Sequence, residues 1–336
     1  MDNKLTKRRL SDFLAYEWIT MIIIAVVAIV VWEFVYTVAS VRLSVGQEFK
    51  FYYDYNLDSG GSSAFYQMII DNEPLSYDVL SLDSESLTKD SNQILSARLS
   101  IKEGDVMFTD CVDYTKKEGA DENTSKEIRV KTLIDNYYGY AFTTLRDDAI
   151  SYLKGFLPDG VTVDEEITFD MLSKEKIEST FRQRMKKDNR FRNEEQIQEG
   201  IKLEEQRLKD LCEEVKDFSY LLSLSSEYPE LFYNYTRYEQ SFELEGDTKY
   251  KGQYQTAVER EKEEGRENVP YALCLSALKG GANKNDPSKY FRLSGSETAD
   301  DVVAMVFNFR SDQPHLQYET ISFINQIVRD CSTFLD

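Results

Sequence analysis

Acidic, hydroxyl and aromatic side chains gather where several predicted strands of this chain end. Carboxylate and hydroxyl oxygens accept hydrogen bonds from polar ligands, and tyrosine rings stack on the apolar faces of sugar rings. These residue types indicate a site for a small polar ligand, with carbohydrates among the candidates. For each residue the alternative is a strand-end cap or a packed ring. The residues selected on this ground are Tyr53, Asp54, Tyr55, Asp83, Thr109 and Asp110, together with Tyr233 and Tyr235 from a later segment.

Motifs for catalysis are scarce in the sequence. The single histidine is His315, in a Ser-Asp-Gln-Pro-His loop, and we find no serine elbow, no paired metal-ligand motif and no phosphate-binding glycine loop. Gly60-Gly61 and Gly280-Gly281 are predicted to be loops. Paired carboxylates are the one catalytic arrangement that so acidic a chain leaves open. We therefore expect a protein that is not an enzyme and that uses no cofactor and no metal.

The charge of the chain limits the classes of partner that it can bind. Its 60 acidic and 40 basic residues give a formal net charge of −20, and the two signs are interspersed. Such a field makes nucleic acids and anionic lipid surfaces poor partners for the molecule as a whole. The cysteines lie far apart without a CxxC pair, so we expect buried free thiols, with disulfide pairing as the alternative. They are Cys111, Cys212, Cys274 and Cys331.

Residues Trp18–Ala39 are the one stretch long and apolar enough to cross a bilayer. About 20 helical residues span a hydrocarbon core of about 30 Å. The preceding tail, residues 1–17, is basic, which favours the cytoplasmic side and predicts a single-pass protein of the cell membrane with its C-terminal region outside. A cleaved signal peptide is the alternative, although the apolar run exceeds the usual length of about 7–15 residues. Glu33 fits the outer interface, between Trp32 and Tyr36.

After the anchor, predicted strands and helices alternate at short spacing. Aromatic content and alternation predict strands at residues 48–55, 77–82 and 105–109, helical spacing predicts helices at 64–70 and 92–101, and residues 58–63 form a Gly/Ser turn. This order predicts a parallel sheet with helices on both faces. Ligands of such sheets bind outside the carboxyl ends of the strands, where the strand order reverses. That rule selects the candidates from the first three strands.

From about residue 113 the pattern becomes mostly helical. Residues 134–156 predict a helical stretch interrupted at Gly139, and residues 174–222 predict the longest helical region. We expect Gly200 and the polar residues 186–189 to break it. Strands return at 269–278 and 302–310, before a closing helix at 318–334. A chain that leaves a first lobe, builds a second and returns to the first would show this order.

Several short motifs lie in this order: Leu95-Ser96-Ala97-Arg98-Leu99, Gly104-Asp105-Val106 before a strand ending in Asp110, Val269–Leu273, and Tyr318–Arg329. Together they resemble the extracytoplasmic solute-binding proteins of ABC transporters, of the bilobal type that serves sugars. The resemblance implies an α/β, two-lobed, periplasmic-binding-protein-like (type II) fold. Residues 43–112 and 266–336 would form lobe 1, and residues 113–265 a mostly helical lobe 2.

Two departures from this family concern the anchor and the helical region. No lipidation cysteine follows the apolar run, so a helix would replace the lipid anchor, and residues 174–222 match no ligand-binding motif. The resemblance implies a membrane-anchored extracellular protein that captures a small polar ligand for the permease of an ABC transporter. The alternative is a surface interaction or scaffold subunit that keeps the bilobal fold, binds no ligand and docks on a membrane partner through its charged helical region.

Overall fold

The chain divides into two units, residues 1–43 and 44–336, and each is described by itself. The first unit contains α2 (Trp18–Ala39), a helix of 22 residues. Its stretch Trp18–Val35 has a mean hydropathy of 2.5, is not buried within the chain, and is long and apolar enough to cross a membrane, although a signal sequence meets the same criteria. The computed structural model describes residues 18–39, 43, 46–58, 60–89, 92–101, 103–117, 120, 127–137, 139–163, 166–236, 259–260, 262–263, 268–307 and 318–336.

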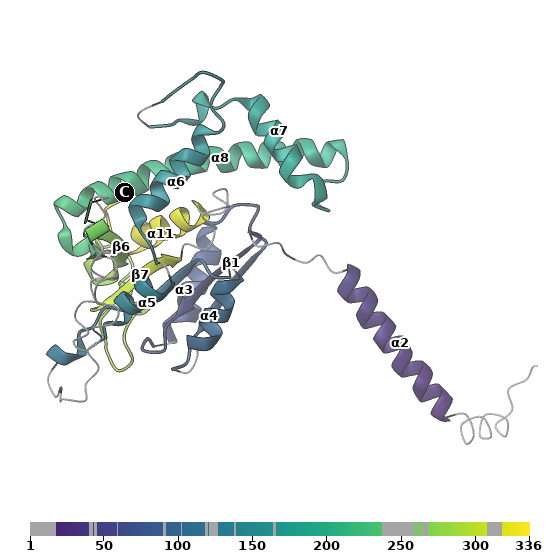
Figure 1. Cartoon of the computed structure of the whole chain (residues 1–336), viewed down its shortest axis with the longest axis horizontal. Coiled ribbons are helices and arrows are strands. Elements are labelled where there is room, and N and C mark those ends of the chain that lie inside the picture. Colours follow the sequence, from purple (N-terminus) through teal and green to yellow (C-terminus); the bar gives the residue numbers. More distant parts are fainter. Residues whose placement is uncertain are drawn as a thin grey trace, which may run out of the picture. The chain divides into compact units, whose positions relative to one another are not determined.

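The second unit is built on one mixed sheet (Figure 1). Its strands lie in the order β2-β1-β3-β7-β6-β5, and β4 also pairs with β7. Strands β1, β2 and β3 are parallel, as predicted from their order, while β7, β6, β5 and β4 form antiparallel pairs, for which no direction was predicted. The strands are β1 (Glu48–Tyr53), β2 (Ser81–Ser86), β3 (Val106–Asp110), β4 (Gly139–Tyr140), β5 (Phe232–Tyr235), β6 (Val269–Cys274) and β7 (Val302–Phe307).

Helices cover both faces of this sheet. The larger core lies under α3 (Gly60–Asn72), α6 (Phe142–Lys154) and α11 (Tyr318–Cys331), with aromatic contacts such as Phe49 on Phe323 at 4.8 Å. The smaller core on the other face includes Leu95 of α4 (Asn92–Ser100) and three residues of α5 (Arg129–Tyr137). The expectation of helices on both faces is confirmed, because the side chains of β1 alternate between the two cores.

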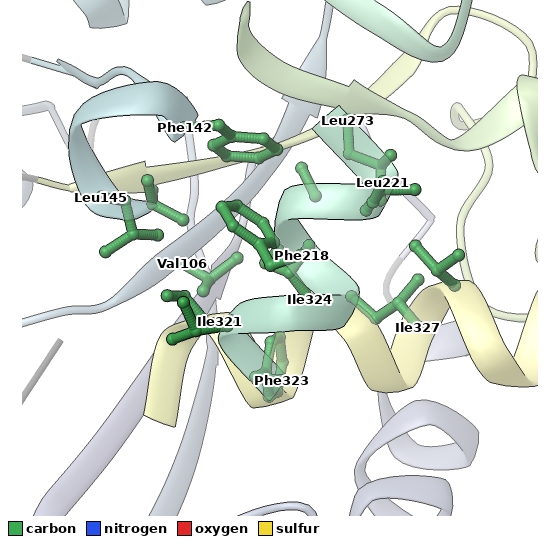
Figure 2. Packing of buried hydrophobic residues seen from close by; sticks show 14 of the residues in the cluster. Val106, Phe142, Leu145, Phe218, Leu221, Leu273, Ile321, Phe323, Ile324 and Ile327 are labelled. Carbon is green, nitrogen blue, oxygen red and sulfur yellow. The ribbon is translucent and has the colours of Figure 1, made fainter. Parts of the chain in front are cut away.

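The long helix α8 (Glu194–Ser223) shares the larger core (Figure 1). Phe218 of α8 lies 5.6 Å from Phe142 of α6, ring centre to ring centre. Figure 2 shows Phe218 close to Phe142 of α6 and Ile324 of α11, with Leu221 beside Leu273 of β6. The helices expected in a second lobe therefore pack into the same compact unit as the sheet. The two-lobed type II arrangement is not confirmed by the part of the chain that the structure describes.

Gly200 does not break this helical region. Helix α7 (Lys174–Arg184) ends before the predicted break at residues 186–189, but α8 runs through Gly200 without interruption. A Cβ atom at Gly200 would lie 2.4 Å from Cζ of Phe181 and 2.6 Å from Cε1 of Phe191. The glycine thus permits close packing of α8 against these rings, which period and propensity alone do not reveal.

Other boundaries differ from the prediction by a few residues. The second strand begins at Ser81, not at Tyr77, and α3 begins at Gly60 inside the predicted turn. There the Asp58 carboxylate accepts a 2.9 Å bond from the Gly60 N–H, which caps the helix start. Short 3-10 turns lie at Tyr114–Lys116, Phe169–Met171, Met185–Lys187, Leu224–Ser226, Pro229–Leu231, Leu275–Ala277 and Pro287–Lys289.

Candidate functional site

The order of the strands reverses between β1 and β3, and three of the predicted site residues lie there. Helix α3 follows β1 onto one face and α4 precedes β3 on the other, so the two crossovers leave the sheet in opposite directions. Such a switch point, at the carboxyl ends of the strands, is where open α/β sheets bind ligands. Asp54 follows β1 directly, while Thr109 and Asp110 end β3.

A buried ion pair occupies this switch point. Arg129, the first residue of α5, donates from Nε to Oδ2 of Asp54 at 2.7 Å and from Nη2 to Oδ1 at 3.3 Å. The Thr109 hydroxyl donates to Oδ2 of Asp54 at 2.7 Å, and the Tyr55 N–H donates to Oδ1 at 2.9 Å. Burial opposes the charge of Arg129, but hydrogen bonding to Asp54 outweighs it, so the pKa of Arg129 is raised. Hydrogen bonds from Arg129, Thr109 and Tyr55 thus fix the position of the Asp54 carboxylate.

Asp110 forms a second buried acid beside this pair. Its Oδ2 accepts a bond from Nδ2 of Asn56 at 2.6 Å, and its Oδ1 accepts one from the Val112 N–H at 3.1 Å. Burial, with a smaller contribution from the charge of Asp54, raises its pKa. Burial and the charge of Asp110 raise the pKa of Tyr114 to about 12, so this phenol stays protonated and can donate.

Tyr53 and Tyr55 differ in burial and in their surroundings. Tyr53 is 1% exposed and its ring lies 6.1 Å from that of Phe291, stacked inside the larger core. Burial raises the pKa of Tyr53, and its hydroxyl has no hydrogen-bond partner among the described residues. Tyr55 is half-buried, with the Arg129 guanidinium 5.4 Å from its ring centre. Tyr55 is therefore the tyrosine of this pair that a ligand could reach.

Asp83 lies apart from the switch point. It sits within β2 and not after it, opposite Lys50 of β1, whose Nζ is 2.9 Å from Oδ2 of Asp83 and 2.8 Å from Oε1 of Glu103. Burial lowers the pKa of Lys50, but hydrogen bonds to Glu103 and Asp83 raise it by more, so the net shift is upward. These contacts tie β2 to β1.

Tyr233 and Tyr235 lie on β5, the strand at the far end of the sheet from β2. Tyr235 is 1% exposed and its hydroxyl donates to Oδ2 of Asp135 at 2.8 Å, while Tyr233 packs against the smaller core. Two strands, β7 and β6, separate β5 from β3. The structure therefore brings Asp54, Thr109 and Asp110 together and leaves Asp83, Tyr233 and Tyr235 elsewhere.

A polar cavity of about 350 Å³ lies in the connection between β6 and β7. Because β7 is antiparallel to β3, with Val302 opposite Asp110, this connection is at the same edge of the sheet as the switch point. Leu293 pairs with Leu57 and Arg292 donates to Asp58 at 2.8 Å, which joins the connection to the end of β1. Its lining includes Lys279, Lys284, Asn285, Asp286, Glu297 and Asp300.

Sequence reasoning did not select these cavity residues. The signal was present, because residues 279–289 form a Gly, Asn and Pro loop with charges of both signs. The pattern did not predict the direction of the last strand, so it did not show at which edge of the sheet this loop lies. The antiparallel direction of β7 moves this loop to the candidate site.

Among the described residues, no group of three or more His, Cys, Asp or Glu side chains is placed to hold a metal ion. The four cysteines are free thiols, as expected, but only Cys212 and Cys331 are buried, whereas Cys111 and Cys274 are half-buried. Burial raises the pKa of both Cys111 and Cys274 to about 12, so these two are protonated at neutral pH. His315 lies outside the described residues.

Comparison with known proteins finds no matching family model, no matching curated protein and no matching solved structure.

Proposed function

We propose that this chain is a membrane-anchored binding protein that holds a small polar ligand at the edge of the sheet formed by the carboxyl ends of β1 and β3. The observation that carries the proposal is the cavity of about 350 Å³ in the β6–β7 connection at that edge. This volume falls in the range of about 300–1,000 Å³ typical of small-molecule sites.

The lining of the cavity suits a ligand with several hydrogen-bonding groups. Lys279 and Glu297 are exposed there and offer opposite charges, while the Ser and Thr hydroxyls add neutral donors and acceptors. The buried Asp54–Arg129 pair and Asp110 form a fixed polar neighbourhood at the same edge. Binding without chemistry is the simplest use of such a site.

Helix α2 supplies the membrane part of the proposal. It is long and apolar enough to span a bilayer, and the basic tail in the sequence favours an N-terminus in the cytoplasm and the binding domain outside. The resemblance to solute-binding proteins supports an ABC transporter permease as the receiving partner and a carbohydrate as one ligand class. In this proposal the ligand is captured outside and passed to that partner.

Calorimetry and thermal-shift measurements on the full-length chain in detergent test the proposal, with monosaccharides, oligosaccharides, amino acids and short peptides as probes. One class should bind, and Lys279→Gln or Glu297→Gln should weaken its binding by about tenfold or more, because each removes a charged hydrogen-bonding group. The matched controls, Lys202→Gln and Glu205→Gln on α8, should bind as the parent does. A folded sample that responds to no probe would contradict the proposal and favour the interaction subunit.

A further inference from the structure

The turn between α7 and α8 concentrates positive charge in an otherwise acidic chain. Residues 185–192, here named the basic turn, contain Lys186, Lys187, Arg190 and Arg192 against the single acid Asp188. The side chains of Lys186, Lys187 and Arg192 are exposed. The net charge of −20 describes the whole chain, but exposed charges beyond a Debye length of about 8–10 Å are largely screened. A nearby surface therefore meets the positive charge of the basic turn and not the net negative charge of the chain.

Ion pairs with the described residues neutralise only part of this charge. Arg190 is held by Asp188 at 2.8 Å and by Asp78 at 2.9 Å. For Lys186, Lys187 and Arg192, by contrast, no ion pair is recorded with any described residue. Outside the basic turn, the nearest acids along the chain are Glu194 and Glu195 in the first turn of α8, and Glu194 is already paired with Arg182 at 2.5 Å.

The basic turn is fixed in position by buried contacts. Met185 and Phe191 pack with Phe181 and Ile201, and Arg190 also donates from Nη1 to the Tyr77 carbonyl at 3.1 Å. Next to it, Arg184 of α7 pairs with the 2% exposed Glu204 of α8 at 2.7 Å. Because these contacts already fix the turn, it loses little conformational entropy when its exposed cations bind a partner.

The basic turn also contacts the segment that leads from the membrane helix. Nε2 of Gln47 donates to Oδ2 of Asp188 at 3.1 Å, and Gln47 is the eighth residue after Ala39, the last residue of α2. Eight residues extend at most roughly 28 Å. The covalent chain therefore limits how far Gln47 can be from the surface of a bilayer that α2 crosses.

We propose that the basic turn binds the anionic phospholipid headgroups of the membrane in which α2 is inserted. Lysine and arginine are the side chains that phosphate prefers, and each cation near an anionic membrane surface strengthens binding by roughly fivefold. The exposed cations Lys186, Lys187 and Arg192 together predict about a hundredfold effect. The contact would orient the domain at the bilayer whether or not the domain binds a small ligand.

Hydrogen exchange of the full-length chain in nanodiscs tests this proposal. Amides of the basic turn should exchange severalfold more slowly in discs containing phosphatidylglycerol than in discs of phosphatidylcholine alone, and high salt should remove the difference. The triple variant Lys186→Gln, Lys187→Gln, Arg192→Gln should remove it as well. The matched control, Lys174→Gln, Lys202→Gln, Lys209→Gln, carries the same charge change on exposed helix positions and should keep it.

Four outcomes would overturn the proposal. Equal exchange in both kinds of disc shows that anionic lipid is not the partner. If the difference in exchange persists in the triple variant, the lipid contact lies elsewhere on the chain. If the control variant also removes the difference, lipid binding depends on the total charge of the chain and not on the basic turn. If soluble polyphosphate protects the basic turn while anionic lipid does not, the partner is another polyanion.

Discussion

At the scale of single residues, the candidate site at the carboxyl ends of β1 and β3 depends on buried charged side chains. Asp54 is 1% exposed and Arg129 supplies its countercharge, while Thr109 occupies a further acceptor position of the carboxylate. A buried pair of this kind adds little net stability over apolar residues of the same shape, but loss of one partner leaves a charge without compensation. The pair therefore fixes α5 to the ends of β1 and β3.

Replacement of Arg129 by methionine should destabilise the protein by about 3–5 kcal/mol, because the buried Asp54 carboxylate loses its countercharge. The double variant Arg129→Met, Asp54→Asn should recover part of this loss, and the difference gives the coupling energy of the pair. Urea unfolding followed by circular dichroism measures both.

Arg146→Met provides the control for this experiment. Arg146 pairs with its exposed neighbour Asp147 at 2.7 Å, so its loss should cost only about 0–1 kcal/mol. If Arg129→Met cost no more than Arg146→Met, Asp54 would not depend on Arg129 for its stability in the buried site.

At the scale of elements, the sequence predicted which helices and strands exist better than it predicted strand direction and long-range contacts. The strand-end rule selected Asp54 and Thr109, which do meet at 2.7 Å, because residues that end parallel neighbours share one edge. Arg129 was missed because its partner lies 75 positions away and nothing in local spacing reports such a contact. Asp83 was misplaced relative to the strand end because β2 begins four residues later than predicted, at Ser81 instead of Tyr77.

Gly200 is the element-scale case in which packing outweighs propensity. Gly200→Ala gains about 1 kcal/mol of helix propensity but forces a methyl group against Phe181 and Phe191, at a cost of about 1–3 kcal/mol. We expect a net loss of stability, measured as a lower midpoint of thermal unfolding. The control Gln206→Ala, at an exposed position of α8, should stay within about 0.5 kcal/mol of the parent. A higher midpoint for Gly200→Ala would show that the rings move aside.

At the scale of the whole molecule, the sequence suggested two lobes because strands flank a long helical region. In the described part of domain 44–336, α6, α8 and α11 instead join the sheet through the larger core. The apolar stripe of α8 was visible in the sequence, but a stripe does not say which surface it covers. That choice depends on long-range contacts such as Phe218 with Phe142, which no local pattern contains.

Because the sheet and α8 share the larger core, we expect them to unfold in one transition. Phe218 is fully buried, so Phe218→Ala should cost about 3–5 kcal/mol and should lower the stability of β1, β3 and α8 together. Hydrogen exchange at increasing urea concentration, on the full-length chain in detergent, follows the peptides of the sheet and of α8 separately. Both should lose protection at the same urea concentration, and the variant should move both midpoints equally. Tyr220→Ala, two residues further on α8 and 53% exposed, should move neither by much. Loss of protection in α8 well before the sheet would contradict the shared core and restore an independent helical lobe.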